Sequence, residues 1–329
     1  MFLFTRSHSM YMAETMIDRH VTIRRLVGIA GMVLALFVLL SVIAYAAYSA
    51  QFANVAAGKS PAPTVICQAP AHQIGDSTVA ITSGGLQRTF LLHLPPSYGY
   101  ILQPLLIGYH GYSWTTKHME DTTQFSVEAD KQNFIVVFPQ GVDDPPSWNA
   151  GVGAYGPTGS ADDVQFTRDL LNYLEKNYCV DKHHVYLTGF SLGGGMAYRL
   201  ACALSDQIAA VATVSGAYYP FGGCHPARPL PVLEIHGAAD HDAPYNGNTA
   251  TRMAAVHDYL NLWLDIDKCS ATSRDFYHQG DVTGTEWKSC ANGSEVVHYR
   301  IGNGGHSWTG SPSLNTQDTV WQFLHQFSY

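Results

Sequence analysis

The amino-acid sequence predicts an α/β fold, in which a mostly parallel sheet is covered by helices on both faces. Two observations predict it. From about residue 78 to the C-terminus, short apolar segments typical of buried strands alternate with segments typical of helices. In addition, one strand-like segment leads directly through a Gly-x-Ser-x-Gly turn into a helix-like segment. The 329 residues are enough for one large domain of this class.

Each expected element follows from its own pattern. Continuous apolar residues or strict alternation predict strands, and apolar residues three to four positions apart predict helices. The expected strands cover residues 87–94 (alternating, as in an edge strand), 104–111, 135–139, 185–188, 209–214, 231–235 and 295–301. The expected helices cover residues 117–132, 163–178 (with Asp162 or Asp163 as N-cap), 194–201, 249–264 and 316–327.

The turn Gly189-Phe190-Ser191-Leu192-Gly193 fits the pattern of a nucleophile elbow. The pattern is short, and glycine and serine are common in loops. The strand before it and the helix after it, however, are the context that an elbow requires. Such a turn places the serine hydroxyl above the sheet edge, at a helix N-terminus whose partial positive charge favours an anion. The sequence therefore predicts an α/β-hydrolase fold with Ser191 as nucleophile.

A nucleophilic serine needs a base that takes its proton and an acid that orients the base. In this fold the chain order is Ser, then Asp or Glu, then His. His306 follows two glycines after the last expected strand, so it is expected at the same sheet edge as Ser191. Asp240 and Asp242 both lie in the loop after the preceding strand, and either carboxylate is a candidate for the acid. Position selects His306 from the 16 histidines of the chain.

Two backbone N–H groups are expected to form the oxyanion hole. One belongs to Leu192, directly after the nucleophile, and the other to Tyr112, in the loop that follows the strand 104–111. His110 is expected to support this loop and not to take part in the chemistry.

Four aromatic residues lie near expected strand ends: Trp114, Trp148, Tyr218 and Trp308. One interpretation is that they bind an aromatic ring of the substrate, and core packing is the default for each of them. Trp148 and Trp308 are the two candidates for substrate binding.

Two loops indicate an open site. Only residues 217–230 separate two of the expected strands, which leaves no room for the lid domain that many α/β-hydrolases carry there. The long loop 141–162 is rich in Gly, Pro and Asp and follows a strand on the catalytic edge. The sequence therefore predicts no lid domain and a site that suits a bulky or polymer-attached ester.

The N-terminal residues are separate from the catalytic domain. Arg24-Arg25 precedes an uncharged apolar segment, residues 26–50, that is long enough to cross a bilayer. The positive-inside rule places residues 1–25 in the cytosol and the rest of the chain outside. The apolar segment is either a signal peptide, cut at one of two small-x-small sites, or an uncut signal anchor, and cleavage is favoured. A linker is expected at 51–66 and the catalytic domain at 67–329.

All six cysteines follow the apolar segment, and an even number in an exported domain predicts three disulfides. Fifteen pairings are open. Cys269–Cys290 is favoured, because it closes one glycine-containing excursion. Cys202–Cys224 would tie the helix after the elbow to a later loop, and Cys67–Cys179 would then join the N-terminal segment to the domain. The sequon Asn292-Gly293-Ser294, in a polar loop, makes Asn292 a candidate glycosylation site.

The charge and composition exclude some partners. The net charge is −8, and the first 50 residues carry four arginines against two acids, which leaves −10 on the rest. A domain this acidic does not favour nucleic acid. No Cys/His spacing indicates zinc, so neither a metal nor a cofactor is expected. Only the N-terminal segment is expected to meet a membrane, and the domain is expected to be a monomer.

Residues 67–329 resemble a family of extracellular esterases: feruloyl esterases, acetylxylan esterases and poly(3-hydroxybutyrate) depolymerases. The likeness runs through these motifs: Tyr109-His110-Gly111, Phe138-Pro139-Gln140-Gly141, Ser147-Trp148-Asn149-Ala150-Gly151, Asp162-Asp163-Val164, Cys179-Val180-Asp181, the elbow, Leu200-Ala201-Cys202, His236-Gly237-Ala238-Ala239-Asp240, Pro244-Tyr245 and Gly304-Gly305-His306-Ser307-Trp308. The cysteine positions look most like the fungal feruloyl esterase C type. The Gly-His-x-Trp ending looks more like the depolymerase and acetylxylan branch.

The resemblance implies a cofactor-free serine carboxylesterase that acts through an acyl-enzyme. The implied substrates are feruloyl or acetyl esters of plant cell-wall polysaccharide such as xylan, or small phenolic esters. The family pattern also favours Asp240 over Asp242 as the acid. A poly(3-hydroxybutyrate) depolymerase-like esterase is one alternative, and a catalytically inactive binding protein of the same fold is another.

Overall fold

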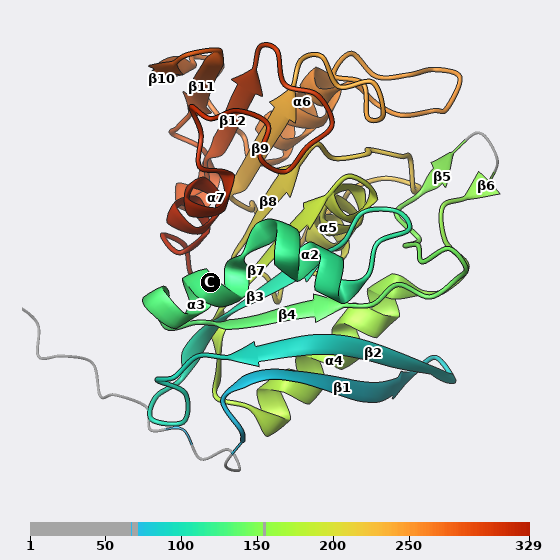
Figure 1. The fold of residues 1–329 in the computed structure, drawn as a ribbon. Helices are drawn as coiled ribbons and strands as arrows, with labels where there is room; N and C mark the ends of the chain where they lie inside the picture. The colour runs from blue at the N-terminus through green and yellow to red at the C-terminus, as the bar shows by residue number, and fades with distance from the viewer. Residues whose placement is uncertain (1–66, 68–71, 154–155) are drawn as a thin grey trace, which may run out of the picture. The chain divides into compact units, whose positions relative to one another are not determined.

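The computed structural model describes Cys67, residues 72–153 and residues 156–329 (Figure 1). In this part of the chain, ten strands form one sheet in the order β1-β2-β4-β3-β7-β8-β9-β12-β11-β10. The central strands β4, β3, β7, β8, β9 and β12 run parallel, and antiparallel strands extend the sheet at both edges. The strands are β1 (Gly75–Ser83), β2 (Leu86–Leu94), β3 (Gln103–Tyr109), β4 (Ile135–Pro139), β7 (Val180–Phe190), β8 (Ala210–Val214), β9 (Val232–Gly237), β10 (Arg274–Gln279), β11 (Val282–Trp287) and β12 (Val296–Ile301). A separate small pair is formed by β5 (Val152–Gly153) and β6 (Gly156–Pro157).

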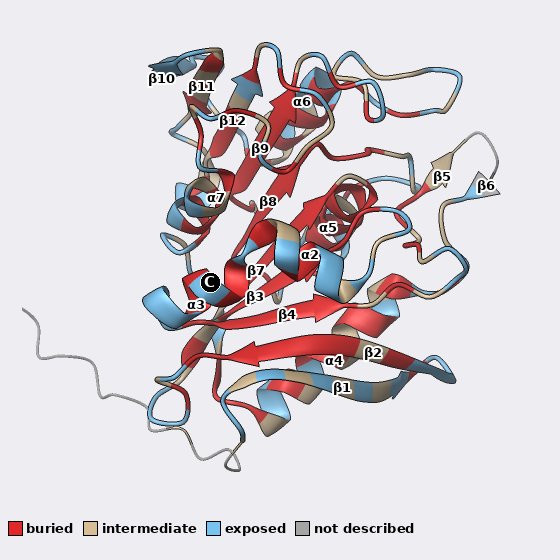
Figure 2. Ribbon diagram, in the orientation of Figure 1, coloured by how far each residue is buried: buried red, intermediate tan, exposed pale blue. Residues whose placement is uncertain are grey.

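Helices cover both faces of the sheet, and the alternation of the strands explains why both faces are apolar. Leu105 and Ile107 of β3 pack in one buried cluster, to which α4, α5 and α6 contribute side chains. Leu106, between them, packs in the second cluster, to which α2, α3 and α7 contribute. Figure 2 shows the central strands buried over most of their length. The helices are α2 (Thr116–Thr123), α3 (Phe125–Gln132), α4 (Asp163–Asn177), α5 (Leu192–Ala203), α6 (Val256–Ile266) and α7 (Thr316–Leu324).

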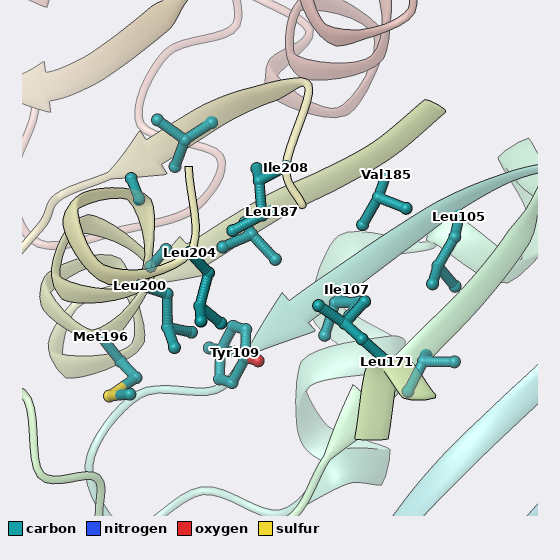
Figure 3. Packing of buried hydrophobic residues seen from close by; sticks show 14 of the residues in the cluster. Leu105, Ile107, Tyr109, Leu171, Val185, Leu187, Met196, Leu200, Leu204 and Ile208 are labelled. Atoms are coloured by element: carbon teal, nitrogen blue, oxygen red, sulfur yellow. The ribbon is translucent and has the colours of Figure 1, made fainter. Parts of the chain in front are cut away.

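The core beneath the catalytic edge is packed from α5 and the two strands next to it. Figure 3 shows that Met196 and Leu200 of α5 point towards Tyr109 of β3 and Leu187 of β7, in the same buried cluster. All four side chains are fully buried. Burying a side chain of this size contributes about 1.5–3 kcal/mol, so this packing fixes α5, and with it the residue before α5, against the sheet.

The predicted fold class is confirmed, and four details of the element prediction are wrong. The strand expected at the edge, 87–94, is covered by β1, which was not expected as a strand and forms the edge itself. The expected helix 117–132 is two helices, because Gln124 adopts a left-handed backbone with φ of 56°. The helix expected from 249 begins only at Val256. The hairpin β10–β11 was missed; the segment of β10 is mostly exposed, so its apolar pattern is weak.

The three favoured disulfides are confirmed: Cys67–Cys179, Cys202–Cys224 and Cys269–Cys290. The first closes a loop with a sequence separation of 112 residues, far longer than the 22 and 21 of the others. In the chain-entropy model the longest loop contributes the largest stabilisation.

Within the described residues, the segment between β8 and β9 contains no helix or strand, so no lid domain is built there. The helices of the described ranges include none that is long and apolar enough to cross a bilayer. The expected segments 1–25, 26–50 and 51–66 lie outside the described residues.

Candidate active site

Ser191 lies on a tight turn between β7 and α5, and its backbone is strained. Its φ of 56° and ψ of −121° are far from the ordinary helix and strand regions, as a nucleophile elbow requires. The flanking glycines have a steric reason. A Cβ on Gly189 would collide with the carbonyl of Gly193, and a Cβ on Gly193 would collide with the carbonyl of Tyr109. The elbow is therefore built only if both positions lack a side chain.

The structure brings Ser191, His306 and Asp240 into one hydrogen-bonded row. Ser191 Oγ lies 2.9 Å from His306 Nε2, and His306 Nδ1 lies 2.8 Å from Asp240 Oδ2. With a neutral imidazole, the serine hydroxyl donates to Nε2 and Nδ1–H donates to the carboxylate. This is the arrangement in which a histidine takes the serine proton while a carboxylate fixes its tautomer.

The loops that carry Asp240 and His306 are bonded directly to each other. Ala239 N donates to Gly304 O at 2.9 Å, and Ala238 N donates to Ile301 O at 2.8 Å. Gly237, at the end of β9, approaches the Gly304 backbone so closely that a Cβ there would collide with it. The acid and the base are thus placed by one joined pair of loops, although 66 residues separate them in the chain.

Asp240 is the partner of His306, and Asp242 is not. Asp240 is 4% exposed, and its Oδ1 accepts from the backbone N–H groups of Asp242 and Ala243 at 2.9 and 2.8 Å. Burial by itself would raise the pKa of Asp240, but hydrogen bonds from His236, His306 and the Ala243 amide outweigh it and hold the pKa below its usual value. Asp240 therefore stays ionised, as an orienting acid must.

Tyr112 borders both hollows that contain Ser191, and Leu192 borders one of them. Leu192 is the first residue of α5. An ideal Cβ on Gly111 would lie 3.4 Å from the Ser191 Cβ, so this loop passes next to the nucleophile. His110 holds the loop, because its Nδ1 donates to Gly111 O at 2.7 Å and its Nε2 accepts from Gly141 N at 3.0 Å. Burial lowers the pKa of His110 to about 4, so this imidazole is neutral and structural, as expected.

Two hollows meet at Ser191. One, of about 550 Å³, is bordered by His306 and by an aromatic wall in which Trp114 stacks on Phe190 with 4.9 Å between ring centroids. The other, of about 510 Å³, lies beside Leu192 and is bordered by residues that include Tyr219 and Met253. In the described part of the chain, no cluster of three or more His, Cys, Asp or Glu side chains is arranged to hold a metal ion.

The prediction that Trp148 binds substrate is wrong. Trp148 is fully buried, its ring packs edge to face on Tyr109, and its Nε1 donates to His110 O at 2.8 Å. It supports the strand end next to the elbow and does not reach a substrate. Trp308 is only 3% exposed and packs on Phe125, although it borders the hollow next to His306.

The sequence named Trp114 among four aromatic residues near strand ends but favoured Trp148 and Trp308 for substrate binding; in the structure Trp114 is the partly exposed tryptophan of the site. It stacks on His118 with 4.0 Å between centroids and borders the same hollow as Ser191 and His306. Its position two residues after Tyr112, at the end of the strand that supplies the expected oxyanion loop, was the available signal.

Comparison with known proteins relates this site to esterases. Residues 88–242 match the family model described as Esterase PHB depolymerase. The chain is 31% identical over 242 residues to feruloyl esterase B of Piromyces equi, a match that covers 68% of this chain and 42% of the relative. It is 27% identical over 230 residues to a bifunctional acetylxylan esterase/xylanase of Neocallimastix patriciarum, covering 68% and 31%. It is 29% identical over 177 residues to feruloyl esterase C of Emericella nidulans, covering 53% and 62%. The chain thus spans less than two thirds of these relatives.

Solved structures show the same fold. The acetyl xylan esterase of Aspergillus awamori aligns with a TM-score of 0.55 at 13% identity, covering 75% of this chain and 98% of that one. An S-formylglutathione hydrolase of Agrobacterium tumefaciens aligns with a TM-score of 0.50 at 12% identity, covering 79% and 99%. Residues 88–242 are therefore similar to the Esterase PHB depolymerase family, the described part of the chain has the α/β-hydrolase fold, and the relatives of the chain include feruloyl and acetylxylan esterases.

Proposed function

We propose that this chain is a serine carboxylesterase that hydrolyses feruloyl esters of plant cell-wall polysaccharide such as xylan. The observation that carries the proposal is the row Ser191–His306–Asp240, with 2.9 and 2.8 Å between the bonded atoms. The relatives named above support the ester as substrate, because feruloyl and acetylxylan esterases are among them.

The proposed reaction proceeds through an acyl-enzyme. Ser191 Oγ attacks the ester carbonyl while His306 Nε2 takes the hydroxyl proton, and Asp240 stabilises the imidazolium that forms. The amides of Leu192 and Tyr112 donate to the oxyanion, each contributing about 3 kcal/mol to the transition state. His306 then gives its proton to the leaving alcohol, and water, activated by the same imidazole, releases the acid.

The two hollows suggest which part of the substrate lies on which side of Ser191. The leaving alcohol must lie next to His306, because this residue protonates it. The hollow next to His306 combines the Trp114 ring with the hydroxyl-bearing residues Thr122 and Thr309, which suits a sugar. The acyl group then occupies the hollow beside Leu192.

The acyl side favours ferulate over acetate. Its hollow is about 510 Å³ and is bordered by Ala217, Tyr219 and Met253, among others. An aromatic acid occupies such a hollow and displaces water from it, whereas an acetyl group leaves most of the hollow to water. A poly(3-hydroxybutyrate) depolymerase-like activity is the second candidate, favoured by the family model.

The experiment is a comparison of kcat/KM for methyl ferulate, p-nitrophenyl acetate and a hydroxybutyrate oligomer. We expect methyl ferulate to be preferred and Ser191→Ala to abolish turnover of all three. Undiminished turnover by Ser191→Ala contradicts the mechanism, whereas a preference for the oligomer contradicts only the substrate.

A matched pair of variants tests which hollow binds the acyl group and which binds the leaving alcohol. Thr251→Phe narrows the hollow beside Leu192, and Thr309→Phe narrows the hollow beside His306. We expect Thr251→Phe to lower kcat/KM for methyl ferulate roughly tenfold relative to p-nitrophenyl acetate. Thr309→Phe should leave that ratio unchanged and impair a feruloylated xylan oligosaccharide. The reverse pattern would exchange the two sides.

A catalytically inactive binding protein of the same fold is distinguished by a fluorophosphonate probe. The esterase is labelled at Ser191 and the inactive protein is not. The bonded Ser191–His306 pair favours labelling.

The proposal places the enzyme outside the cell, as a monomer. Three disulfides support an oxidising compartment. Asn292 is exposed, in keeping with glycosylation at this position. N-terminal sequencing of the protein from culture medium distinguishes a cleaved signal peptide from a signal anchor, and its mass before and after deglycosylation tests Asn292.

A further inference from the structure

The hydrogen-bonded row at Ser191 continues into the protein interior. Asp240 Oδ2 faces two imidazoles: His306 Nδ1 at 2.8 Å and His236 Nε2 at 3.4 Å. On the other ring nitrogen, His236 Nδ1 lies 2.7 Å from Glu234 Oε1. Glu234 is fully buried and His236 is 1% exposed. The mechanism above uses neither residue.

The partners of His236 determine its protonation. Its Nε2 lies 2.8 Å from the carbonyl oxygen of Ala243, which accepts and cannot donate. Its Nδ1 faces Glu234, whose Oε1 accepts from Tyr218 OH at 3.2 Å. His298 Nδ1 lies 2.7 Å from Glu234 Oε2 and hydrogen-bonds the Glu234 backbone oxygen at 3.2 Å. These neighbours favour the carboxylate form of Glu234. With Glu234 ionised, both nitrogens of His236 carry a proton, and the residue is an imidazolium between two carboxylates.

The other groups around His236 do not replace its charge. The Tyr245 ring lies edge-on to His236, 5.8 Å between centroids, and its hydroxyl bonds His298 Nε2 at 2.8 Å. Arg300 is opposite His236 in the β9–β12 register, but it is exposed and its guanidinium lies 5.7 Å from the Tyr245 ring centroid.

We propose that His236 is a positioning residue for the esterase reaction, a buried imidazolium that Glu234 holds against the carboxylate of Asp240. The proposal rests on the proposed function, because it assigns a role behind the same triad. The His236 imidazolium holds the Asp240 carboxylate in the position that orients His306. It also offsets part of the negative charge of Asp240 that acts on His306.

The electrostatics agree with this geometry. Burial by itself would lower the pKa of His236, but the Glu234 charge and the hydrogen bonds with Asp240, Glu234 and Ala243 raise it to about 10. Burial would likewise raise the pKa of Glu234, and the charge and hydrogen bonds of His236, with those of His298, lower it to about 2.

The role has a consequence for the pH dependence of catalysis. Without the cation, Asp240 attracts a proton on His306 more strongly, so the base is blocked at a higher pH. We expect His236→Gln to lower kcat roughly tenfold to a hundredfold. We also expect it to move the ascending limb of the kcat/KM profile upward by on the order of one pH unit.

Glu234→Gln removes the carboxylate that holds the second proton on His236 and leaves the imidazole itself in place. A neutral glutamine no longer requires the second proton on His236, so the limb should move in the same direction. His298→Gln is the matched control, because His298 contacts Glu234 and Tyr245 and does not hydrogen-bond Asp240. It should lower stability and leave the limb in place. A limb that stays fixed in His236→Gln and Glu234→Gln, or moves equally in His298→Gln, overturns the proposal.

A measurement on the unsubstituted protein covers the case in which the variants do not fold. Nitrogen-15 spectra of the histidine-labelled protein, with His236 assigned through its backbone, report the protonation of each ring nitrogen. We expect both nitrogens of His236 to be protonated between about pH 5 and 8. A neutral tautomer of His236 in that range refutes the inference even if the esterase activity is established, whereas an imidazolium in a protein without esterase activity contradicts only the proposed function.

Discussion

The pKa values of two buried aspartates of this molecule, Asp163 and Asp240, are shifted in opposite directions. Asp163, 2% exposed at the start of α4, pairs with Arg88 of β2 at 2.7 Å. Burial raises the pKa of Asp163, and the Arg88 charge and the Asn149 amide only partly offset it. Asp240 is 4% exposed, yet hydrogen bonds from two imidazoles and a backbone amide lower its pKa.

The difference shows that burial alone does not decide the state of a carboxylate. Asp163 holds the framework: its Oδ2 accepts from Asn149 N at 2.7 Å in the loop 141–162, and Arg88 also lies 3.8 Å over the Phe166 ring. In the proposed mechanism Asp240 orients His306, and its Oδ2 faces two imidazoles, which can change their protonation. We therefore expect loss of Asp163 to cost stability and loss of Asp240 to cost activity.

The largest expected effect is at Asp240. Asp240→Asn should lower kcat about 10⁴-fold, because an amide no longer fixes the tautomer of His306. The thermal unfolding midpoint should fall as well, because a carboxylate with a lowered pKa stabilises the fold at neutral pH, so kcat is measured on the folded protein. Asp242→Asn is the control, and a fall of less than about fivefold is expected, since Asp242 is exposed. Equal losses in the two variants would reverse the assignment of the acid.

The second effect is on stability. Asp163→Ala leaves the Arg88 guanidinium buried without its counter-charge and should lower the free energy of unfolding by about 3–5 kcal/mol, measured by denaturant titration. The kcat of the remaining folded protein should stay within a few-fold. Replacing both partners, in Arg88→Met with Asp163→Ala, should recover most of the lost stability. A collapse of kcat with unchanged stability would remove the distinction between the two aspartates.

The third effect is a pH window of stability set by Glu234 and His236. The pKa of Glu234 is lowered to about 2, so its contribution is present above about pH 4.5 and is lost as the pH falls towards 2. The pKa of His236 is raised to about 10, so its contribution is complete below about pH 6.5 and is lost as the pH rises towards 10.

The stability of the protein relative to a Glu234→Gln, His236→Gln double variant should therefore be greatest between about pH 4.5 and 6.5, and should fall by roughly 2–4 kcal/mol by about pH 9. Urea unfolding at several pH values measures it. A difference that does not vary with pH would show that the two groups are not an ion pair.

The smallest effect concerns Trp148, which connects framework and site. Trp148→Phe removes the Nε1 donor to His110 O and should cost about 1–2 kcal/mol of stability. A modest fall in kcat should accompany it, because His110 supports the loop of Tyr112. A specific rise in KM for methyl ferulate, with stability unchanged, would instead restore Trp148 as a substrate contact.

Much of the fold and the site could be predicted from local patterns. The elbow glycines, the apolar β3 and β7 and the order Ser191, Asp240, His306 are local signals, because backbone sterics and burial act over a few residues. The strands β1, β10 and β11 were not predicted. They lie at the sheet edges, where one face or both faces meet water, so their apolar pattern is weak.

Side-chain direction at the ends of the strands was beyond local patterns. Trp114 follows the expected strand 104–111 by three residues and Trp148 follows the expected strand 135–139 by nine, and neither spacing shows that Trp148 is in the core while Trp114 borders the site. Likewise, the sequence contains the motif from His236 to Asp240, but no pattern shows that His236 turns inward to Glu234 and Asp240 at once.

The sequence by itself determined the fold class and the chain order of nucleophile, acid and base, because periodicity and turn chemistry are properties of neighbouring residues. Only the tertiary structure decided that Asp240 and not Asp242 meets His306, that Trp148 is a core residue, and that a buried His236 lies behind the acid. These depend on contacts between segments far apart in the chain, where burial and hydrogen-bond partners are set by packing.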